Sequence, residues 1–158
     1  MNIILKGLVV FSLAIILWGV NTPAYSIGDR YILGEERMQK EEIQGIIQKA
    51  AKAWETGEVR EFVQLFAPNG KFIVPGQESV GQAEIESAVQ QFLEKSKNIQ
   101  ISISRIVAED HVAVVEWHWE STQEGGEADV ADDAIVIDFE DGRITRWREY
   151  MDRKSFNP

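Results

Sequence analysis

Glu149 is the residue of this sequence with the clearest potential for acid/base chemistry. It lies two positions after Trp147 in the run Arg146-Trp-Arg-Glu-Tyr150. Because residues two apart on a strand share a face, we expect its carboxyl group beside the indole of Trp147. Apolar surroundings raise the pKa of a carboxyl group, so Glu149 is a candidate proton donor or acceptor near neutral pH. The alternative is a glutamate that pairs with an arginine such as Arg105, or that meets water.

A β-hairpin must position this glutamate. Asp141-Gly142 lies between two runs of β-branched and aromatic residues and is typical of a two-residue type I′ turn. Such a turn predicts four opposed pairs: Glu140 with Arg143, Val136 with Trp147, Ala134 with Glu149, and Asp132 with Met151. This register makes Asp132 a second candidate catalytic carboxylate, one strand away from Glu149.

Three apolar stripes with helical spacing precede the long strands. Their members are Ile43, Ile46, Ile47, Ala50 and Trp54; then Val59, Phe62, Val63 and Phe66; then Ile85, Ala88, Val89 and Phe92. The first helix should begin near Lys40 and stop near Gly57, and Pro68-Asn-Gly70 should break the second. The third should follow Gly81 and end near Lys97.

Strands are expected at residues 71–74, 99–107 and 112–120, before the final hairpin. Helices followed by a meander of strands predict an α+β domain, in which helices cover one face of an antiparallel sheet. In the hairpin around Glu109-Asp110, a three-residue turn at 108–110 or a bulge places the large apolar residues on that covered face. These are Ile99, Ile101, Ile103, Trp117 and Trp119, with Arg105 as the only charge among them.

The opposite face of the sheet is predicted to carry apolar side chains as well. Its expected members are Val112, Val114, Ile135, Ile137, Phe139, Ile144 and Tyr150, among Glu116, His118, Asp133 and Arg148. A sheet that is apolar on both sides favours a homodimer, with a second copy of the chain covering this outer face. An ordinary surface with scattered apolar residues is the alternative.

The first 26 of the 158 residues have the features of an export signal. Lys6 precedes an apolar run up to Val20, and the small residues Ala24 and Ser26 suit cleavage after Ser26. The alternative is an uncleaved membrane anchor, but the run is shorter than the roughly 20 residues that span a bilayer. We therefore expect cleavage, and no stable membrane anchor after it. We therefore divide the chain into a signal peptide (1–26), a linker or N-terminal arm (27–39), one domain (40–153) and a tail (154–158).

The composition of the chain indicates its cellular compartment and disfavours one class of partner. An exported chain without cysteines or Asn-x-Ser/Thr sequons fits the periplasm or the exterior of a bacterium, with stability from packing alone. The formal charge is −10, and removal of Lys6 with the signal leaves 15 basic and 26 acidic residues, or −11. Such a surface repels phosphate backbones and disfavours nucleic-acid binding.

The segments Trp54-Glu-Thr-Gly57, Leu65-Phe-Ala-Pro-Asn-Gly70 and Asp141-Gly-Arg-Ile-Thr-Arg-Trp-Arg-Glu-Tyr-Met-Asp152 resemble a SnoaL-like member of the nuclear transport factor 2-like superfamily. The resemblance spans residues 42–152. It implies a cone-shaped α+β barrel, cystatin-like, in which a curved sheet wraps around two to three helices and encloses an apolar cavity. It also implies dimers through the convex face. Family enzymes include polyketide cyclases, ketosteroid isomerase and limonene epoxide hydrolase.

Two of these activities lack their residues. The positions matching the base and the two oxyanion-binding groups of ketosteroid isomerase are Val74, Ala50 and Ala134. For limonene epoxide hydrolase Glu149 matches one aspartate, but the other polar positions hold Trp117, Trp119, Phe72 and Val74. A lone carboxylate cannot both polarise an epoxide and orient water. Polyketide cyclases of the family work with few polar groups, so acid/base catalysis by Glu149 remains open.

The family cavity predicts a site for a small apolar or aromatic molecule. The expected ligand-binding residues are Phe72, Val74, Phe92, Trp117, Trp119 and Trp147, with Trp54 in the core. The alternative is an interaction module whose tryptophans fill the cone. No cofactor or metal is expected, because His111 and His118 form no metal pair and strand alternation divides the acidic run 129–133 between two faces.

Overall fold

The structure, a computed structural model, describes residues 38–153. The predicted signal peptide, the tail and all but the last two residues of the arm lie outside this range. The helices are α1 (Lys40–Thr56), α2 (Val59–Gln64) and α3 (Gln82–Lys95). The strands are β1 (Phe66–Val74), β2 (Gln77–Val80), β3 (Ser96–Glu109), β4 (Val112–Gln123), β5 (Ala128–Glu140) and β6 (Arg143–Arg153).

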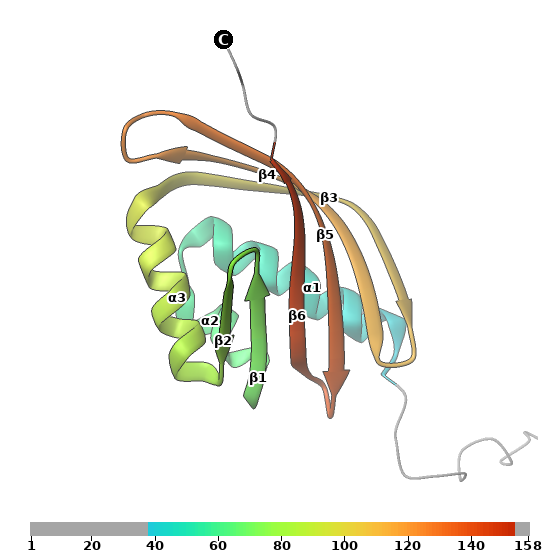
Figure 1. The fold of residues 1–158 in the computed structure, drawn as a ribbon. Helices are drawn as coiled ribbons and strands as arrows, with labels where there is room; N and C mark the ends of the chain where they lie inside the picture. Colours follow the sequence, from blue (N-terminus) through green and yellow to red (C-terminus); the bar gives the residue numbers. More distant parts are fainter. Residues whose placement is uncertain (1–37, 154–158) are drawn as a thin grey trace, which may run out of the picture. The chain divides into compact units, whose positions relative to one another are not determined.

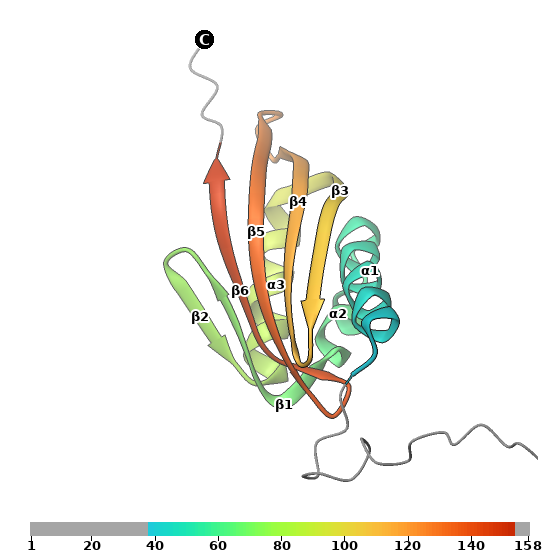
Figure 2. The same cartoon turned by 90° about the vertical axis from the view of Figure 1, so that its right-hand side faces the viewer.

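The strands form one curved sheet with the order β2-β1-β6-β5-β4-β3. The long strands β3 to β6 bend around the helices, so that the concave face of the sheet encloses them (Figures 1 and 2). All neighbouring strands are antiparallel except β1 and β6, which run parallel. The expected α+β cone, with a curved sheet wrapped around N-terminal helices, is confirmed.

Helix α1 is held in the cone by the predicted stripe, since its apolar members are all buried. It ends at Gly57, whose φ of 71° is left-handed and whose N–H caps the helix through the carbonyl groups of Ala53 and Trp54. The second stripe ends earlier than predicted, because Phe66 begins β1 instead of continuing α2. Gly70 lies where β1 shifts register against β6, and a Cβ there would come 2.8 Å from the carbonyl oxygen of Ile144.

The β5–β6 hairpin departs from the predicted register by one residue. Glu140 pairs with Arg143 across the Asp141-Gly142 turn as expected, but the register then shifts because β6 contains one extra residue, Thr145. The observed pairs are Ile137 with Trp147, Ile135 with Glu149, and Asp133 with Met151. The predicted partners Val136, Ala134 and Asp132 were therefore wrong.

The β3–β4 hairpin follows the bulge alternative. Its turn is Asp110-His111, and the extra residue is Ser104, between the pairs Ile103–Trp117 and Arg105–Glu116. Ile101 lies opposite Trp119, so the isoleucines share the concave face with the tryptophans as predicted. Arg105 follows the bulge and turns outward, which corrects its expected place among them.

These registers change the outer face of the sheet. Ile135, Ile137, Phe139 and Ile144 are at most 4 % exposed and face the helices, as does Asp133, so their assignment to the convex side was wrong. The large apolar residues that remain exposed on the long strands are Val107, Val112, Val114 and Tyr150. They are interspersed with charged groups such as the Arg105–Glu116 pair, 3.5 Å apart. The apolar count that favoured a dimer through this face is therefore smaller than expected.

Two neighbouring positions of β5 face opposite sides of the sheet and should differ in how much their side chains stabilise the fold. Ile137→Ala should lower the free energy of unfolding by about 2–5 kcal/mol, because Ile137 is fully buried against Trp147. Val136→Ala, on the half-buried outer face, should cost less than about 1 kcal/mol. Urea unfolding of the two variants measures both values. The reverse ranking would restore the bulge-free register.

Candidate functional site

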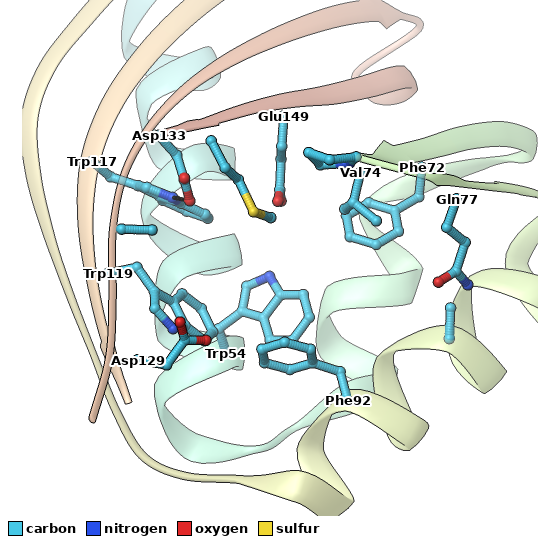
Figure 3. A pocket seen from close by; sticks show the side chains of 14 residues that line it. Trp54, Phe72, Val74, Gln77, Phe92, Trp117, Trp119, Asp129, Asp133 and Glu149 are labelled. Atoms are coloured by element: carbon cyan, nitrogen blue, oxygen red, sulfur yellow. Dashed lines mark hydrogen bonds between the residues drawn. The ribbon is translucent and has the colours of Figure 1, made fainter. Parts of the chain in front are cut away.

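A cavity of about 640 Å³ opens between the concave sheet, α1 and α3 (Figure 3). Its size is within the usual range for small-molecule sites. It is lined by Trp54, Phe72, Val74, Pro75, Gln77, Ala88, Phe92, Trp117, Trp119, Asp129, Ala131, Asp133, Glu149 and Met151. Five of the predicted ligand-binding residues, Phe72, Val74, Phe92, Trp117 and Trp119, are therefore wall residues.

The wall combines aromatic rings with carboxyl groups. Five of the 14 lining residues are Trp or Phe, three are Asp or Glu, and none of these described lining residues is Lys, Arg or His. Flat apolar faces favour a flat apolar ligand, while the few polar groups fix its orientation.

The part of the cone around Trp147, here called the base, is filled instead of hollow. Trp147 is fully buried there, and its ring centroid lies 5.6 Å from that of Phe62 and 5.5 Å from that of Trp117. Trp147 does not line the cavity, so its expected contact with a ligand is not available in this structure. The alternative of a cone filled by its own tryptophans thus describes the base, but not the space above it.

Glu149 lies at the boundary between this filled base and the cavity. Its side chain is held from β6, is 8 % exposed and points into the cavity (Figure 3). The indole N–H of Trp147 donates a hydrogen bond of 2.8 Å to Oε1 of Glu149. Burial raises the pKa of Glu149 to about 8; the Trp147 hydrogen bond opposes this rise, and the charge of Asp133 adds to it. Glu149 therefore holds its proton at neutral pH.

Asp133, and not Asp132, is the second acidic group beside Glu149. Asp133 is 6 % exposed, lines the cavity, and accepts a hydrogen bond of 2.9 Å from the indole N–H of Trp117. Asp132 points to the convex face, where its Oδ1 lies 2.6 Å from Nδ1 of His118. The prediction of Asp132 as a catalytic partner is wrong because of the extra residue in β6.

His118 lies on the outer face of the sheet, as predicted, in a cluster with two acidic side chains. His118 lies between Asp132 and Glu120, with its Nε2 3.1 Å from Oε1 of Glu120. The hydrogen bond with Asp132, followed by that with Glu120, raises the pKa of His118 above its usual 6.5. No group of three or more His, Cys, Asp or Glu side chains within residues 38–153 could hold a metal ion. No described helix is long and apolar enough to cross a membrane.

Arg105 does not neutralise Glu149. Its guanidinium lies 3.5 Å from Glu116 on the outer face, and its side chain is 68 % exposed. The alternative of an ion pair between Glu149 and Arg105 is therefore wrong, and the neutral acid remains.

Sequence reasoning missed two important wall residues. Trp54 was expected in the core, because its position on the α1 stripe does not distinguish a side chain that packs from one that also faces a cavity. Asp133 was assigned to the outer face. A signal for it existed, since the apolar residues Ile144 and Trp147 of β6 are three positions apart, a spacing that requires a bulge if both face inward.

A neutral acid, a second carboxyl group and aromatic walls allow proton transfer to a bound molecule. The protonated Glu149 can donate to a ligand oxygen, and Asp133 offers acceptor oxygens on the same wall. In these buried surroundings, electrostatic interactions are stronger than in water.

The raised pKa of Glu149 predicts the direction in which the stability of the fold changes with pH. From pH 4.5 to about pH 8 the folded chain keeps this proton and the unfolded chain loses it, so rising pH destabilises the fold. Glu149→Gln removes the effect. The stability of this variant relative to wild type should rise by up to about 1.4 kcal/mol per pH unit across that window.

Denaturant unfolding at several pH values measures this difference. Glu116→Gln, at an exposed site of the outer face, is the matched control. Its free energy of unfolding should change with pH in the same way as that of wild type. A constant difference between Glu149→Gln and wild type would contradict a proton held at neutral pH.

Comparison with solved structures places this geometry on a known fold. A protein of Catenulispora acidiphila with a ketosteroid isomerase-like fold, in complex with trimethylamine, is 18 % identical with a TM-score of 0.63, over 66 % of this chain and 83 % of that one. An LEH-like epoxide hydrolase of M. tuberculosis is 18 % identical with a TM-score of 0.63, over 71 % and 84 %.

A further similar structure and the family model agree with this placement. An NTF2-like protein of unknown function from Burkholderia pseudomallei is 14 % identical with a TM-score of 0.66, over 72 % of this chain and 92 % of that one. No curated protein sequence matches the chain. The model of the SnoaL-like domain matches residues 47–147, which include part of α1, all of α2 and α3, and most of the sheet. The chain therefore belongs to the SnoaL-like family, within the nuclear transport factor 2-like fold.

Proposed function

We propose that this chain is an exported pocket protein that binds a small apolar or aromatic molecule and transfers protons to and from it through Glu149. The observation that carries the proposal is a buried carboxyl group, with a pKa near 8, in the wall of a cavity of about 640 Å³. Strongly shifted pKa values in concave apolar sites are typical of acid/base catalysis.

The site supports isomerase-like, cyclase-like or hydrolase-like chemistry, all of which need a proton at a ligand oxygen. Glu149 supplies that proton from the wall of the cavity. The proton arrives as a bond of the ligand breaks or shifts and negative charge develops on the oxygen. Asp133 is the second carboxyl group and can accept a proton from another atom of the ligand. The role of Trp147 is to orient Glu149 through its N–H.

Two measurements test the pocket and its acid. Naphthalene derivatives should quench the tryptophan fluorescence, because three indoles line the cavity. β-Tetralone in heavy water should exchange its α-protons faster with the protein than with buffer, and Glu149→Gln should abolish this acceleration while still binding the ketone.

The same Glu116→Gln variant serves as the control for this experiment. Quenching without accelerated exchange would leave a binding protein and remove the catalytic part. An unchanged fluorescence spectrum across the panel would remove the pocket.

Export and self-association complete the proposal. Cleavage after Ser26 should leave Ile27 as the first residue, and the exposed valines of β3 and β4 with Tyr150 of β6 offer an apolar area for a second copy. Intact mass of the protein recovered from the bacterial envelope, followed by sedimentation, should give a dimer of residues 27–158. An intact mass that includes residues 1–26 would contradict cleavage after Ser26, absence of the protein from the envelope would contradict export, and a monomer at micromolar concentration would contradict the dimer.

A further inference from the structure

Four indole N–H groups lie inside the cone, and three of them have acceptors within the chain. Trp117 donates to Asp133 at 2.9 Å, Trp147 to Glu149 at 2.8 Å, and Trp119 to Oγ of Ser121 at 3.2 Å. The fourth, Nε1 of Trp54, is buried and has no hydrogen-bond partner among the described residues. Buried N–H groups are almost always paired, so this exception needs an explanation.

Trp54 is fixed firmly in its orientation. Its ring is only 6 % exposed and packs against Phe62 at 5.2 Å and against Phe92 and Trp119 at 5.6 Å, the last two edge-on. The aromatic packing therefore holds the indole rigidly enough for its N–H to select what approaches it.

The free N–H points into the cavity. Trp54 is one of the lining residues, and Figure 3 shows its indole nitrogen directed toward the side of the cavity that holds Glu149. The protonated carboxyl group of Glu149 is a second donor on that side. Two donors that face the same part of an apolar chamber from different walls match an oxygen acceptor in a molecule that is otherwise apolar.

We propose that the indole N–H of Trp54 binds an oxygen atom of the ligand, and that the ligand is an aromatic or apolar carbonyl compound held with that oxygen between Trp54 and Glu149. This rests on the proposed function of the cavity and adds the class of ligand and a specificity-determining residue. An indole donates only, so a ligand that offers an N–H or a cation at this point is rejected.

A matched pair of probes tests the assignment. Acetylnaphthalene and ethylnaphthalene have nearly the same shape and differ in the carbonyl oxygen, and fluorescence titration gives the affinity of each. Wild type should prefer the ketone. Trp54→Phe, which keeps an aromatic ring but removes the N–H, should reduce that preference by about tenfold. Glu116→Gln, at an exposed site of the outer face, is the control, and its ratio of the two affinities should stay that of wild type.

A second measurement needs no variant. In the isotope-labelled wild-type protein, the indole N–H resonance of Trp54, assigned through its contacts with the rings of Phe62 and Phe92, should move downfield on addition of the ketone and stay in place with the hydrocarbon.

The outcomes separate this inference from the proposed function. Equal affinity of wild type for the two probes, a ketone preference that survives Trp54→Phe, or a Trp54 resonance that ignores the ketone would each overturn the role of Trp54 while the pocket stands. Failure of both probes to bind would remove the pocket itself, and the inference with it.

Discussion

One extra residue in β6, Thr145, determines which side chains of that strand face the helices beyond Ile144. Without it, Trp147 and Glu149 would lie on the convex side of the sheet, because β4 holds Ile135 on the concave face through its pair with Val115. With it, the apolar residues of both strands share one face, and Ile144 and Trp147 are both fully buried. Since burial of large apolar side chains is the main stabilising term in folding, this register shift is strongly favoured.

The same register shift creates the chemistry of the site. It brings Glu149 to the concave face beside Asp133, which the pairing with Trp117 of β4 already holds there, while Asp132 lies on the outer face with His118. Two acidic groups near each other in an apolar chamber cannot both ionise at low cost, and burial is the larger contribution to the raised pKa of Glu149. The proton on Glu149 is therefore a consequence of strand register, with the indole N–H of Trp147 restraining the shift.

The helices and the fold class could be read from the sequence because they depend on local periodicity. Stripe residues of α1 such as Ile47 and Trp54 are buried as predicted, and the resemblance at the end of the chain identified the family. The hairpin at Asp141-Gly142 was located correctly as well. In each case, the signal lies within one element or one turn.

The site was less predictable because it depends on pairing between elements. A turn fixes register only until the first bulge, so without the bulge at Thr145 the prediction exchanged Asp133 for Asp132 and reversed the face of the apolar residues of β5. The depth of Trp147 and the cavity-facing edge of Trp54 depend on how the rings interlock in three dimensions. The spacing of residues in the sequence does not reveal this packing.

The central claim is that Glu149 carries a proton at neutral pH inside the cone. The carboxyl carbon resonance of Glu149, followed by NMR across a pH titration of the folded protein, tests this directly. The account predicts a midpoint near pH 8. A midpoint at the ordinary value of 4.5 would show a solvated, ionised glutamate and would contradict the account.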